Sequence, residues 1–351
     1  MKLMRWFLIL LFISNGVLAQ DIQVVGSLNQ TVEIPNHQLF RSMRSDLKQV
    51  TVLQVELSDN ALQKLSERAD NLLYNEVIID SPSKVQLGMA NVPVLDQGRH
   101  GACVTFATMG AVNAILKKGD YLSELCLLQL GRYIEKNSYS PSGWEGSTGG
   151  NVLNQMQMFG LVSKAQELAN GCGGLTAYPL NDEGETGTEM SPEQYHQLSE
   201  PMKMDMVGWS VILDIYHVFL DKIDMKEVLN QVKYSLNGGD RITFGILLPD
   251  VNKGVVGAVG RHHADYDSWI LTPQIAKDMK TQKITAAHEM IITGYDDKAV
   301  AVDEEGHSYK GLFTLRNSWG ANIGNKGDFY MSYDYFKALA LEAIRIRHVP
   351  D

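Results

Sequence analysis

The amino-acid sequence predicts an α+β protein with two lobes, one helical and one rich in strands. Apolar residues recur at helical spacing between about residues 103 and 161. After about residue 225, short β-rich runs alternate with glycine and asparagine. A helical half followed by a β-rich half is typical of the α+β class. The length of 351 residues leaves room for about two such units.

The composition is that of a globular protein with a buried core. Hydrophobic residues make up 44% and charged residues 21% of the chain. The formal net charge of −10 argues against nucleic acid and anionic membrane surfaces as partners. We therefore expect neither.

The first residues, MKLMRWFLILLFISNGVLAQ, have the features of a signal peptide. Lys2 and Arg5 form a basic region, an apolar run follows, and Val17 and Ala19 occupy the small-residue positions of a cleavage site. The apolar run is shorter than the roughly 20 residues that span a bilayer. We expect removal of residues 1–19, a secreted or periplasmic protein, and no membrane association afterwards; an uncleaved anchor is the alternative.

Residues 20–85 are expected to form an N-terminal unit made of a hairpin and a helix. The stretch 22–34 alternates apolar and polar residues around a Leu-Asn-Gln centre, which predicts a small hairpin, and 49–57 predicts a further strand. Helical spacing of leucine and alanine predicts a helix over about 59–74. This unit has little apolar mass of its own, so it should pack on the rest of the chain.

The remainder is divided into a helical lobe and a β-rich lobe. Residues 86–205 are expected to hold three helices and an inserted polar loop; the helices run from Cys103 to a stop at Gly119, over about 122–135 and over 151–161, and the loop covers 181–201. Residues 206–351 carry the β-rich runs RITFGILLP, MIITGYD, KAVAVD, GLFTLRNSWG and DFYMSYDYF.

Three cysteines allow at most one disulfide. Cys126 lies in an apolar run and is most simply a buried thiol, whereas Cys172 lies in a glycine-rich loop. In an oxidising compartment the two could pair, and both readings stay open. Neither has a nearby cysteine or histidine of the kind that a zinc site requires, so no metal is expected.

The third cysteine, Cys103, is a candidate nucleophile because it would begin a helix. Unsatisfied N–H groups and the helix dipole favour an anion there and lower the pKa of a thiol. A nucleophile also needs a base, and the base needs an orienting group. His288 precedes a β-run that could face a cleft between the lobes, and Asn317 follows another. The adjacent pair His262 and His263 is the alternative for catalysis or metal binding.

The blocks QGRHGACVTFAT, AAHEMIITGYD and LRNSWGANIGNKGDFY resemble the cysteine, histidine and asparagine blocks of papain-like cysteine proteases, in the same chain order. The resemblance covers roughly residues 90–340. It implies a papain-like two-lobe fold, in which the active-site cleft lies between a helical N-terminal lobe and a β-barrel-like C-terminal lobe. It also implies an exported, bacterial-type C1 peptidase that cuts protein or peptide substrates without a metal or organic cofactor.

The resemblance implies a role for each matching residue. Cys103 matches the nucleophile, His288 the general base and later acid, and Asn317 the residue that orients the imidazole. Gln97 matches the side chain of the oxyanion hole, where the backbone N–H of Cys103 would be the second donor. Trp319 matches the indole that shields the histidine and asparagine from water.

Four further residues are implied to contact substrate. Gly149 and Gly150 resemble the family's glycine pair, which hydrogen-bonds an extended peptide through bare backbone. Ala287 and Glu289 flank the base, and in the family such neighbours help to shape the pocket for the second residue before the scissile bond. The carboxylate of Glu289 could favour a basic side chain there or point to solvent, depending on the register of the strand.

The chain departs from the family at its disulfides. His100 and Ser147 stand where the family usually has two bonded cysteines. Cys126 and Cys172 do not fall on the family's other bridge positions, so the resemblance does not predict that they pair.

The placement of residues 20–85 before the family-like core predicts a propeptide that blocks the cleft in cis, in an otherwise monomeric zymogen. A permanent structural extension is the alternative. Two other functions remain: an acyl-transfer enzyme of the transglutaminase or deamidase type, and a non-catalytic binding protein on a protease scaffold. The intact NSWG block, together with Gln97, favours the protease.

Overall fold

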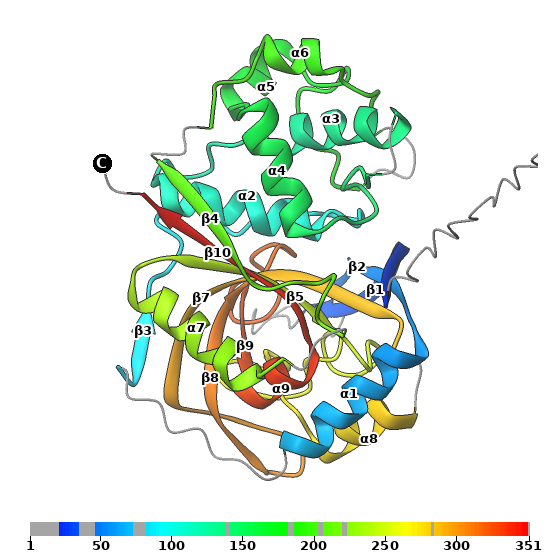
Figure 1. The fold of residues 1–351 in the computed structure, drawn as a ribbon, viewed down its shortest axis with the longest axis vertical. Helices are drawn as coiled ribbons and strands as arrows, with labels where there is room; N and C mark the ends of the chain where they lie inside the picture. Colours follow the sequence, from blue (N-terminus) through cyan, green and yellow to red (C-terminus); the bar gives the residue numbers. More distant parts are fainter. Residues whose placement is uncertain are drawn as a thin grey trace, which may run out of the picture.

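The computed structural model describes eight stretches of the chain, namely 21–34, 46–72, 82–137, 140–181, 186–202, 206–219, 223–281 and 284–349. The expected signal peptide, residues 1–19, lies outside them and stays a prediction. Two lobes are visible, one helical and one built on a sheet (Figure 1). The predicted α+β class and two-lobe fold are therefore confirmed. Within the described stretches, no helix has both the length and the apolar character needed to cross a bilayer.

The helical lobe is arranged around one buried helix. Its five helices are α2 (Cys103–Leu116), α3 (Glu124–Asn137), α4 (Gly149–Phe159), α5 (Lys164–Asn170) and α6 (Pro192–His196). Helix α2 is buried from Cys103 to Ile115 because it packs against both the other helices and the sheet. The expectation of a loop over 181–201 is partly wrong, since Ser191 forms a capping box that starts α6.

The second lobe contains an open sheet. Its main path runs β4-β10-β5-β7-β8-β9-β6. The strands are β3 (Lys84–Gln86), β4 (Val207–Leu213), β5 (Arg241–Leu247), β6 (Ser268–Trp269), β7 (Ala286–Val302), β8 (Ser308–Arg316), β9 (Asp328–Ser332) and β10 (Ala340–His348). Strand β7 is central, because it pairs with β5 on one side and with β8 on the other. The sheet does not close on itself, so the lobe is less barrel-like than expected.

Three helices of this lobe were not predicted from the sequence, because the chain after residue 225 was interpreted as strands alone. They are α7 (Met225–Asn237), α8 (Pro273–Thr281) and α9 (Tyr333–Leu339). The run DFYMSYDYF was read as a strand, yet the Ser332 hydroxyl accepts a hydrogen bond from the Tyr335 N–H and starts α9. Helix capping by a single side chain therefore outweighed the β propensity of the aromatic residues.

The N-terminal unit consists of β1 (Ile22–Ile34), β2 (Asp46–Leu57) and α1 (Asp59–Leu72). The expectation of a hairpin within residues 22–34 is wrong, because that stretch is one continuous strand that pairs antiparallel with β2 along its whole length. Alternation alone cannot distinguish a long strand from two short ones. The later strand and the helix lie where the sequence predicts them.

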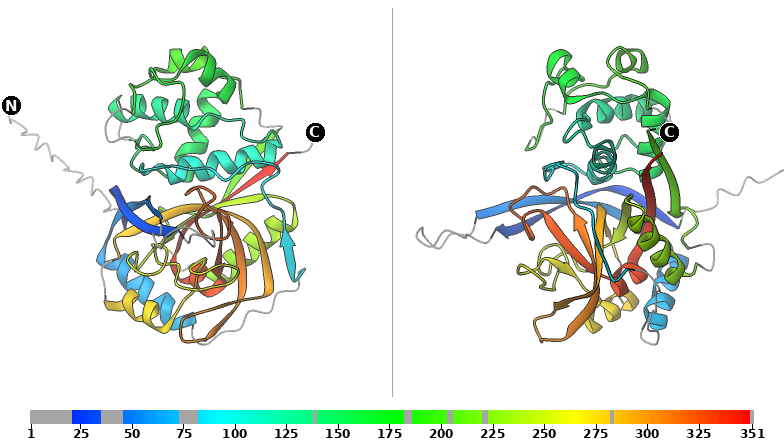
Figure 2. Two further views of the ribbon diagram at one scale, coloured as in Figure 1. Left: turned by 180° about the vertical axis from the view of Figure 1, so that it is seen from behind. Right: turned by 90° about the vertical axis from the view of Figure 1, so that its left-hand side faces the viewer.

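This unit is built into the second lobe, as its small apolar content suggested. Helix α1 buries Ala61, Leu65 and Ala69 and packs on α8 and α9. The guanidinium of Arg68 donates hydrogen bonds to the carbonyls of Ala340 (3.1 Å) and Val218 (3.0 Å). Strand β2 adds to β7, and the β1–β2 hairpin lies between the two lobes (Figure 2).

Cys126 and Cys172 form a disulfide, with their Cα atoms 5.0 Å apart. It joins α3 to the loop that follows α5, across 46 residues of sequence. The sequence left open whether these two cysteines pair, and the structure shows that they do. Cys103 remains the free thiol.

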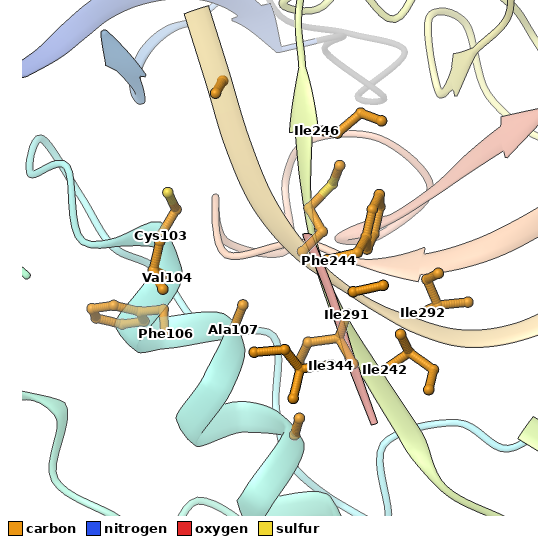
Figure 3. Close-up of a cluster of buried hydrophobic side chains, with 14 of the residues drawn as sticks. Cys103, Val104, Phe106, Ala107, Ile242, Phe244, Ile246, Ile291, Ile292 and Ile344 are labelled. Atoms are coloured by element: carbon orange, nitrogen blue, oxygen red, sulfur yellow. The ribbon is translucent and has the colours of Figure 1, made fainter. Parts of the chain in front are cut away.

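The interface between the lobes is apolar and holds the start of α2 against the sheet (Figure 3). Ala107 of α2 lies toward isoleucine and phenylalanine side chains of β5, β7 and β10, whereas Phe106 points away from the strands and packs on Tyr178. A Cβ at Gly110 would lie 3.1 Å from Cδ1 of Ile291, so this glycine allows the close approach of helix and sheet. Cys103 is thereby fixed next to β7.

Candidate active site

Cys103 is the first residue of α2, and its side chain is fully buried. Burial raises the pKa of its thiol to about 12, with the negative charge of Glu289 as the second cause. Backbone N–H groups of Glu289, Val104 and Cys103 itself favour the thiolate, but they do not outweigh burial. The expectation of a lowered thiol pKa is therefore wrong for this structure, although the helix starts where it was predicted.

His288 lies on β7 and is held by Asn317, which follows β8. The imidazole Nε2 is 2.8 Å from Oδ1 of Asn317. That oxygen also accepts the N–H of Ser318 at 2.7 Å, so the carbonyl side of the amide faces the ring and Nε2 carries the hydrogen. Nδ1 is then the basic atom, and it has no hydrogen-bond partner among the described residues. Burial lowers the pKa of His288 to about 4, so the ring is neutral in this form.

Trp319 covers the histidine. Its indole stacks on the imidazole, with ring centroids 4.5 Å apart and planes at 22°. Trp319 is itself buried against Trp269 and Phe329. The indole lies where a shield for the hydrogen bond between His288 and Asn317 would be needed.

Gln97 lies beside the same residues, with its side-chain amide fixed from three directions. Its Oε1 accepts the hydroxyl of Ser318 at 2.7 Å, and its Nε2 donates to the His100 carbonyl at 2.9 Å. Nε2 also donates, at 3.2 Å, to the carbonyl of Thr51 in β2. Ser318 was missed by the sequence reading, although it lies in the NSWG block. Thr51 was missed because nothing local marks it.

The hairpin contacts both sides of the site. Lys48 pairs with Asp96 at 2.5 Å and donates to the Trp319 carbonyl at 2.7 Å. On the helical lobe, the Ser27 hydroxyl donates to the Glu145 carboxylate.

Apolar side chains of the hairpin fill the space beside residues 146–150, the sequence GSTGG. A Cβ at Gly146 would lie 2.4 Å from Cγ1 of Val24 and 3.4 Å from Cδ2 of Leu53. Leu53 also pairs along the backbone with Ala287, the residue before the histidine. The hairpin therefore contacts both the turn around Gly146 and the strand that carries His288.

Gly149 and Gly150 begin α4, which Thr148 caps. The N–H of Gly149 donates to Oε2 of Glu342 at 2.9 Å. A Cβ at Gly150 would meet nothing within 4 Å, so open space lies beside it. Their binding of substrate stays a prediction.

Glu289 does not point to solvent, because only 3% of the residue is exposed. It lies close to Glu342 of β10, since a Cβ at Gly245 would be 3.0 Å from Oε2 of Glu289 and 3.6 Å from Cβ of Glu342. Burial, and then the charge of Glu342, raise the pKa of Glu289 well above its usual range. Burial raises the pKa of Glu342 to about 7. Glu342 was overlooked, although it is the lone carboxylate of the apolar run ALALEAIRI.

These raised pKa values predict a pH dependence of stability. Between about pH 4.5, the ordinary value, and about pH 7, the Glu342 carboxyl binds more protons in the folded chain than in the unfolded chain. Its contribution to the free energy of unfolding should therefore fall as the pH rises through this window, whereas the lowered pKa of His288 has the opposite effect in both proteins. In Glu342→Gln the fall should be smaller, because one titrating carboxyl is lost and the pKa of Glu289 is less raised. Thermal unfolding followed by circular dichroism from about pH 5 to about pH 8 measures it. Glu124, whose pKa burial also raises to about 7, contributes equally to both proteins, so equal pH slopes would contradict the expectation.

The alternative histidine pair lies elsewhere. His262 and His263 pack on Tyr330, with ring centroids 4.6 and 5.2 Å away. They line a separate cavity of about 300 Å³ with Lys84 and Asp328. Among the described residues, Asp303, Glu305 and His307 have potential ligand atoms that lie within 4.8 Å of one another, close enough to share a cation. Hydrogen bonds between Asp303 and His307 already account for its geometry.

Residues 190–351 match the model of the Peptidase C1-like family. The match covers less than half of the chain, and it agrees with the resemblance to papain-like cysteine proteases. The predicted enzyme class, a cysteine-type peptidase, is the class that this family defines. The matched part contains His288 and Asn317, whereas Cys103 and Gln97 precede it.

The solved structures whose fold resembles this one include cysteine proteases, and their sequence identity to this chain is low. Xylellain from Xylella fastidiosa is 19% identical, with a TM-score of 0.48 over 76% of this chain and 86% of that one. Bromelain from Ananas comosus is 16% identical, with a TM-score of 0.46 over 77% of this chain and 100% of that one. Procathepsin L 3 of Tenebrio molitor is 17% identical, with a TM-score of 0.46 over 82% and 79%. No curated protein matches the sequence.

Proposed function

We propose that the protein is an exported cysteine protease, made as an autoinhibited zymogen, that hydrolyses peptide bonds through Cys103, His288 and Asn317. The observation that carries the proposal is the orientation of His288. Its Nε2 is engaged by Asn317, and the basic Nδ1, on the strand that packs against the Cys103 sulfur, has no hydrogen-bond partner in the described part of the chain. A neutral histidine with one free basic nitrogen can accept a thiol proton.

In the acylation step, Nδ1 of His288 takes the proton from Cys103, and the thiolate attacks the carbonyl carbon of the scissile bond. The new oxyanion accepts hydrogen bonds from Nε2 of Gln97 and from the backbone N–H of Cys103. The C–N bond then breaks, and the imidazolium gives its proton to the leaving amine. The product is a thioester on Cys103.

In the deacylation step, His288 accepts a proton from water, and the hydroxide attacks the thioester carbonyl. The C–S bond breaks, the imidazolium returns its proton to the sulfur of Cys103, and the acid product leaves. Asn317 keeps the ring oriented through both steps. None of these steps requires a metal or an organic cofactor.

Autoinhibition follows from what the hairpin occupies. The Thr51 carbonyl accepts the Gln97 hydrogen bond that the oxyanion would need. Leu53 and Gln54, further along β2, pair with the backbone of Ala287 and Ala286, next to the base. We therefore assign residues 20–85 to an N-terminal inhibitory unit and residues 86–351 to the peptidase domain, with 86–205 as its helical lobe and 206–351 as its β-rich lobe.

The other functions considered fit the site less well. Acyl-transfer enzymes that use a cysteine and a histidine usually orient the histidine with aspartate, whereas this chain uses the Asn317 amide. A non-catalytic binding protein would have no need of a free basic nitrogen on a buried, oriented histidine.

A vinyl-sulfone peptide that traps nucleophilic thiols tests the proposal. The full chain should react slowly, and the chain should react faster after limited proteolysis. The adduct should map to Cys103 by mass spectrometry and be absent in Cys103→Ala. The disulfide keeps Cys126 and Cys172 unreactive, so these positions serve as internal controls. Labelling at another residue, or none after proteolysis, would contradict the assignment.

A further inference from the structure

The loop formed by residues 97–100, which carries the side chain proposed for the oxyanion hole, lies against residues 178–180 of the segment that follows α5. Three hydrogen bonds join the loop to the segment, and each uses a different residue on either side. They are the Tyr178 hydroxyl to the Gln97 carbonyl at 2.9 Å, the Arg99 N–H to the Leu180 carbonyl at 3.1 Å, and Nε2 of the His100 ring to the Pro179 carbonyl at 2.8 Å. Because a carbonyl oxygen only accepts, Nε2 of His100 carries the hydrogen. The loop is thus fastened to the segment along its length.

Gly98 is required for this contact. Its φ is +58°, in the left-handed region that favours glycine, and a Cβ there would lie 2.0 Å from the Leu180 carbonyl oxygen. A larger residue would drive the loop and the segment apart. The two backbones therefore meet directly at the residue after Gln97.

Aromatic neighbours fix the ring of Tyr178. Trp144 stacks on it with ring centroids 5.7 Å apart and planes at 6°, and Phe106 of α2 meets it edge-on at 4.9 Å. The His100 ring meets it edge-on at 5.7 Å. Burial raises the pKa of Tyr178 well above its ordinary value, so the hydroxyl keeps its hydrogen and donates it to the Gln97 carbonyl. The hydroxyl is therefore a donor with a fixed direction.

These hydrogen bonds hold a loop that has no covalent bridge of its own. His100 occupies a position at which papain-like proteases usually have a bonded cysteine. The disulfide of this chain lies on the other side of the contact, where Cys172 ties the start of the segment to α3. The disulfide therefore restrains the segment, and the hydrogen bonds carry that restraint to the loop.

The position of the loop determines where the side-chain amide of Gln97 lies. Its Oε1 accepts the Ser318 hydroxyl, and its Nε2 donates to the His100 carbonyl. His100 is itself held by Pro179, and the backbone of Gln97 is held by Tyr178. A misplacement of about 1 Å at a catalytic group can cost about 100-fold in rate. The contact with the oxyanion therefore depends on the hydrogen bonds that hold this backbone.

We propose that Tyr178 is a positioning residue of the oxyanion hole. Its hydroxyl holds the Gln97 backbone at the place from which Nε2 reaches the oxyanion in the transition state. This inference rests on the proposed protease function. Tyr178 acts through Gln97 and not on the reacting atoms, so its effect should appear only where an oxyanion forms.

Tyr178→Phe tests the proposal, because it removes the hydroxyl and keeps the ring. In the chain cut at a protease site inserted between Leu57 and Ser58, it should lower kcat about 2- to 10-fold, the range of one neutral hydrogen bond, and leave KM unchanged. In a Gln97→Ala chain it should lower kcat no further, because the group that it positions is gone. Alkylation of Cys103 by iodoacetamide should keep its wild-type rate, because the sulfur attacks a CH₂ group, iodide leaves, and no oxyanion forms.

Tyr195→Phe is the matched control. It removes the hydroxyl of another tyrosine of the helical lobe, which is buried and donates to the Gly160 carbonyl at 3.1 Å. Its kcat should equal that of the wild type. The proposal would be overturned by a wild-type kcat in Tyr178→Phe, by an equal fall in the Gln97→Ala chain, or by a parallel fall in the rate of alkylation.

Hydrogen exchange followed by mass spectrometry gives a readout that does not depend on activity. In the uncut chain, Tyr178→Phe should raise the exchange rates of the amides of residues 97–100, whereas Tyr195→Phe should not. Unchanged exchange in Tyr178→Phe would refute the proposal. If the cut wild-type chain hydrolyses no peptide while exchange rises in Tyr178→Phe alone, the protease function fails and the anchoring of the loop by Tyr178 stands.

Discussion

Releasing the β1–β2 hairpin is expected to raise the rate of peptide hydrolysis by at least about 100-fold, the value of one oxyanion-hole donor. In the closed form, the Thr51 carbonyl accepts the hydrogen bond of Gln97, and burial holds the pKa of Cys103 at about 12. Once the hairpin leaves, water and substrate reach the sulfur and the helix start can favour the thiolate. The measurement compares kcat/KM of the chain before and after cutting at a protease site inserted between Leu57 and Ser58.

Two controls separate release of the hairpin from the cut itself. The wild-type chain treated with the same protease should show no change. Lys48→Ala in the uncut chain should raise activity partially, because it removes the hydrogen bonds to Asp96 and Trp319 that fasten β2. Equal rates before and after cutting, with the hairpin shown by mass spectrometry to have left, would mean that the unit is a permanent structural extension.

Replacing His288 by alanine is expected to lower kcat/KM of the cut chain by about 10²- to 10⁴-fold, the usual contribution of a general acid–base group. Nδ1 of the His288 imidazole is the proposed acceptor of the thiol proton. The loss should appear in kcat more than in KM, because the imidazole acts on the reacting atoms. Steady-state kinetics with one fluorogenic peptide measures both parameters.

The matched control for this variant is His263→Ala. His263 is an exposed histidine that packs on Tyr330 in a different cavity, so its loss should leave kcat/KM unchanged. An activity in His288→Ala close to that of the wild type would contradict the assigned base. A comparable loss in His263→Ala would point instead to the histidine pair.

Local patterns predicted much of the fold and named residues that the structure brings together, namely His288, Asn317 and Trp319. The helix that starts at Cys103 follows from apolar spacing and a glycine stop, and His288 and Asn317 follow from blocks of sequence around them. The hydrogen bond between these two residues was anticipated because catalysis through a histidine requires an orienting group. Such features depend on residues near one another in the chain, or on a chemical need that few residues can meet.

What escaped prediction depends on contacts between distant segments. Thr51 meets Gln97 across 46 residues, and Glu342 meets Gly149 across 193. No periodicity marks such pairs. The thiol pKa of Cys103 was misjudged for the same reason, because its burial is produced by tertiary packing that the sequence does not display. Helices α7 and α9 were missed where a capping side chain decided between two local preferences.

Helix α1 would limit where a cut that releases the hairpin can fall. Arg68 donates hydrogen bonds to two carbonyls of the β-rich lobe, and Leu65 is fully buried. Removal of the whole N-terminal unit would therefore expose apolar surface of that lobe. A cut after Leu57 removes the obstruction and spares the anchor. The active enzyme would then keep helix α1 as a structural part of the β-rich lobe, and its new N-terminus would lie at Ser58, at the start of that helix.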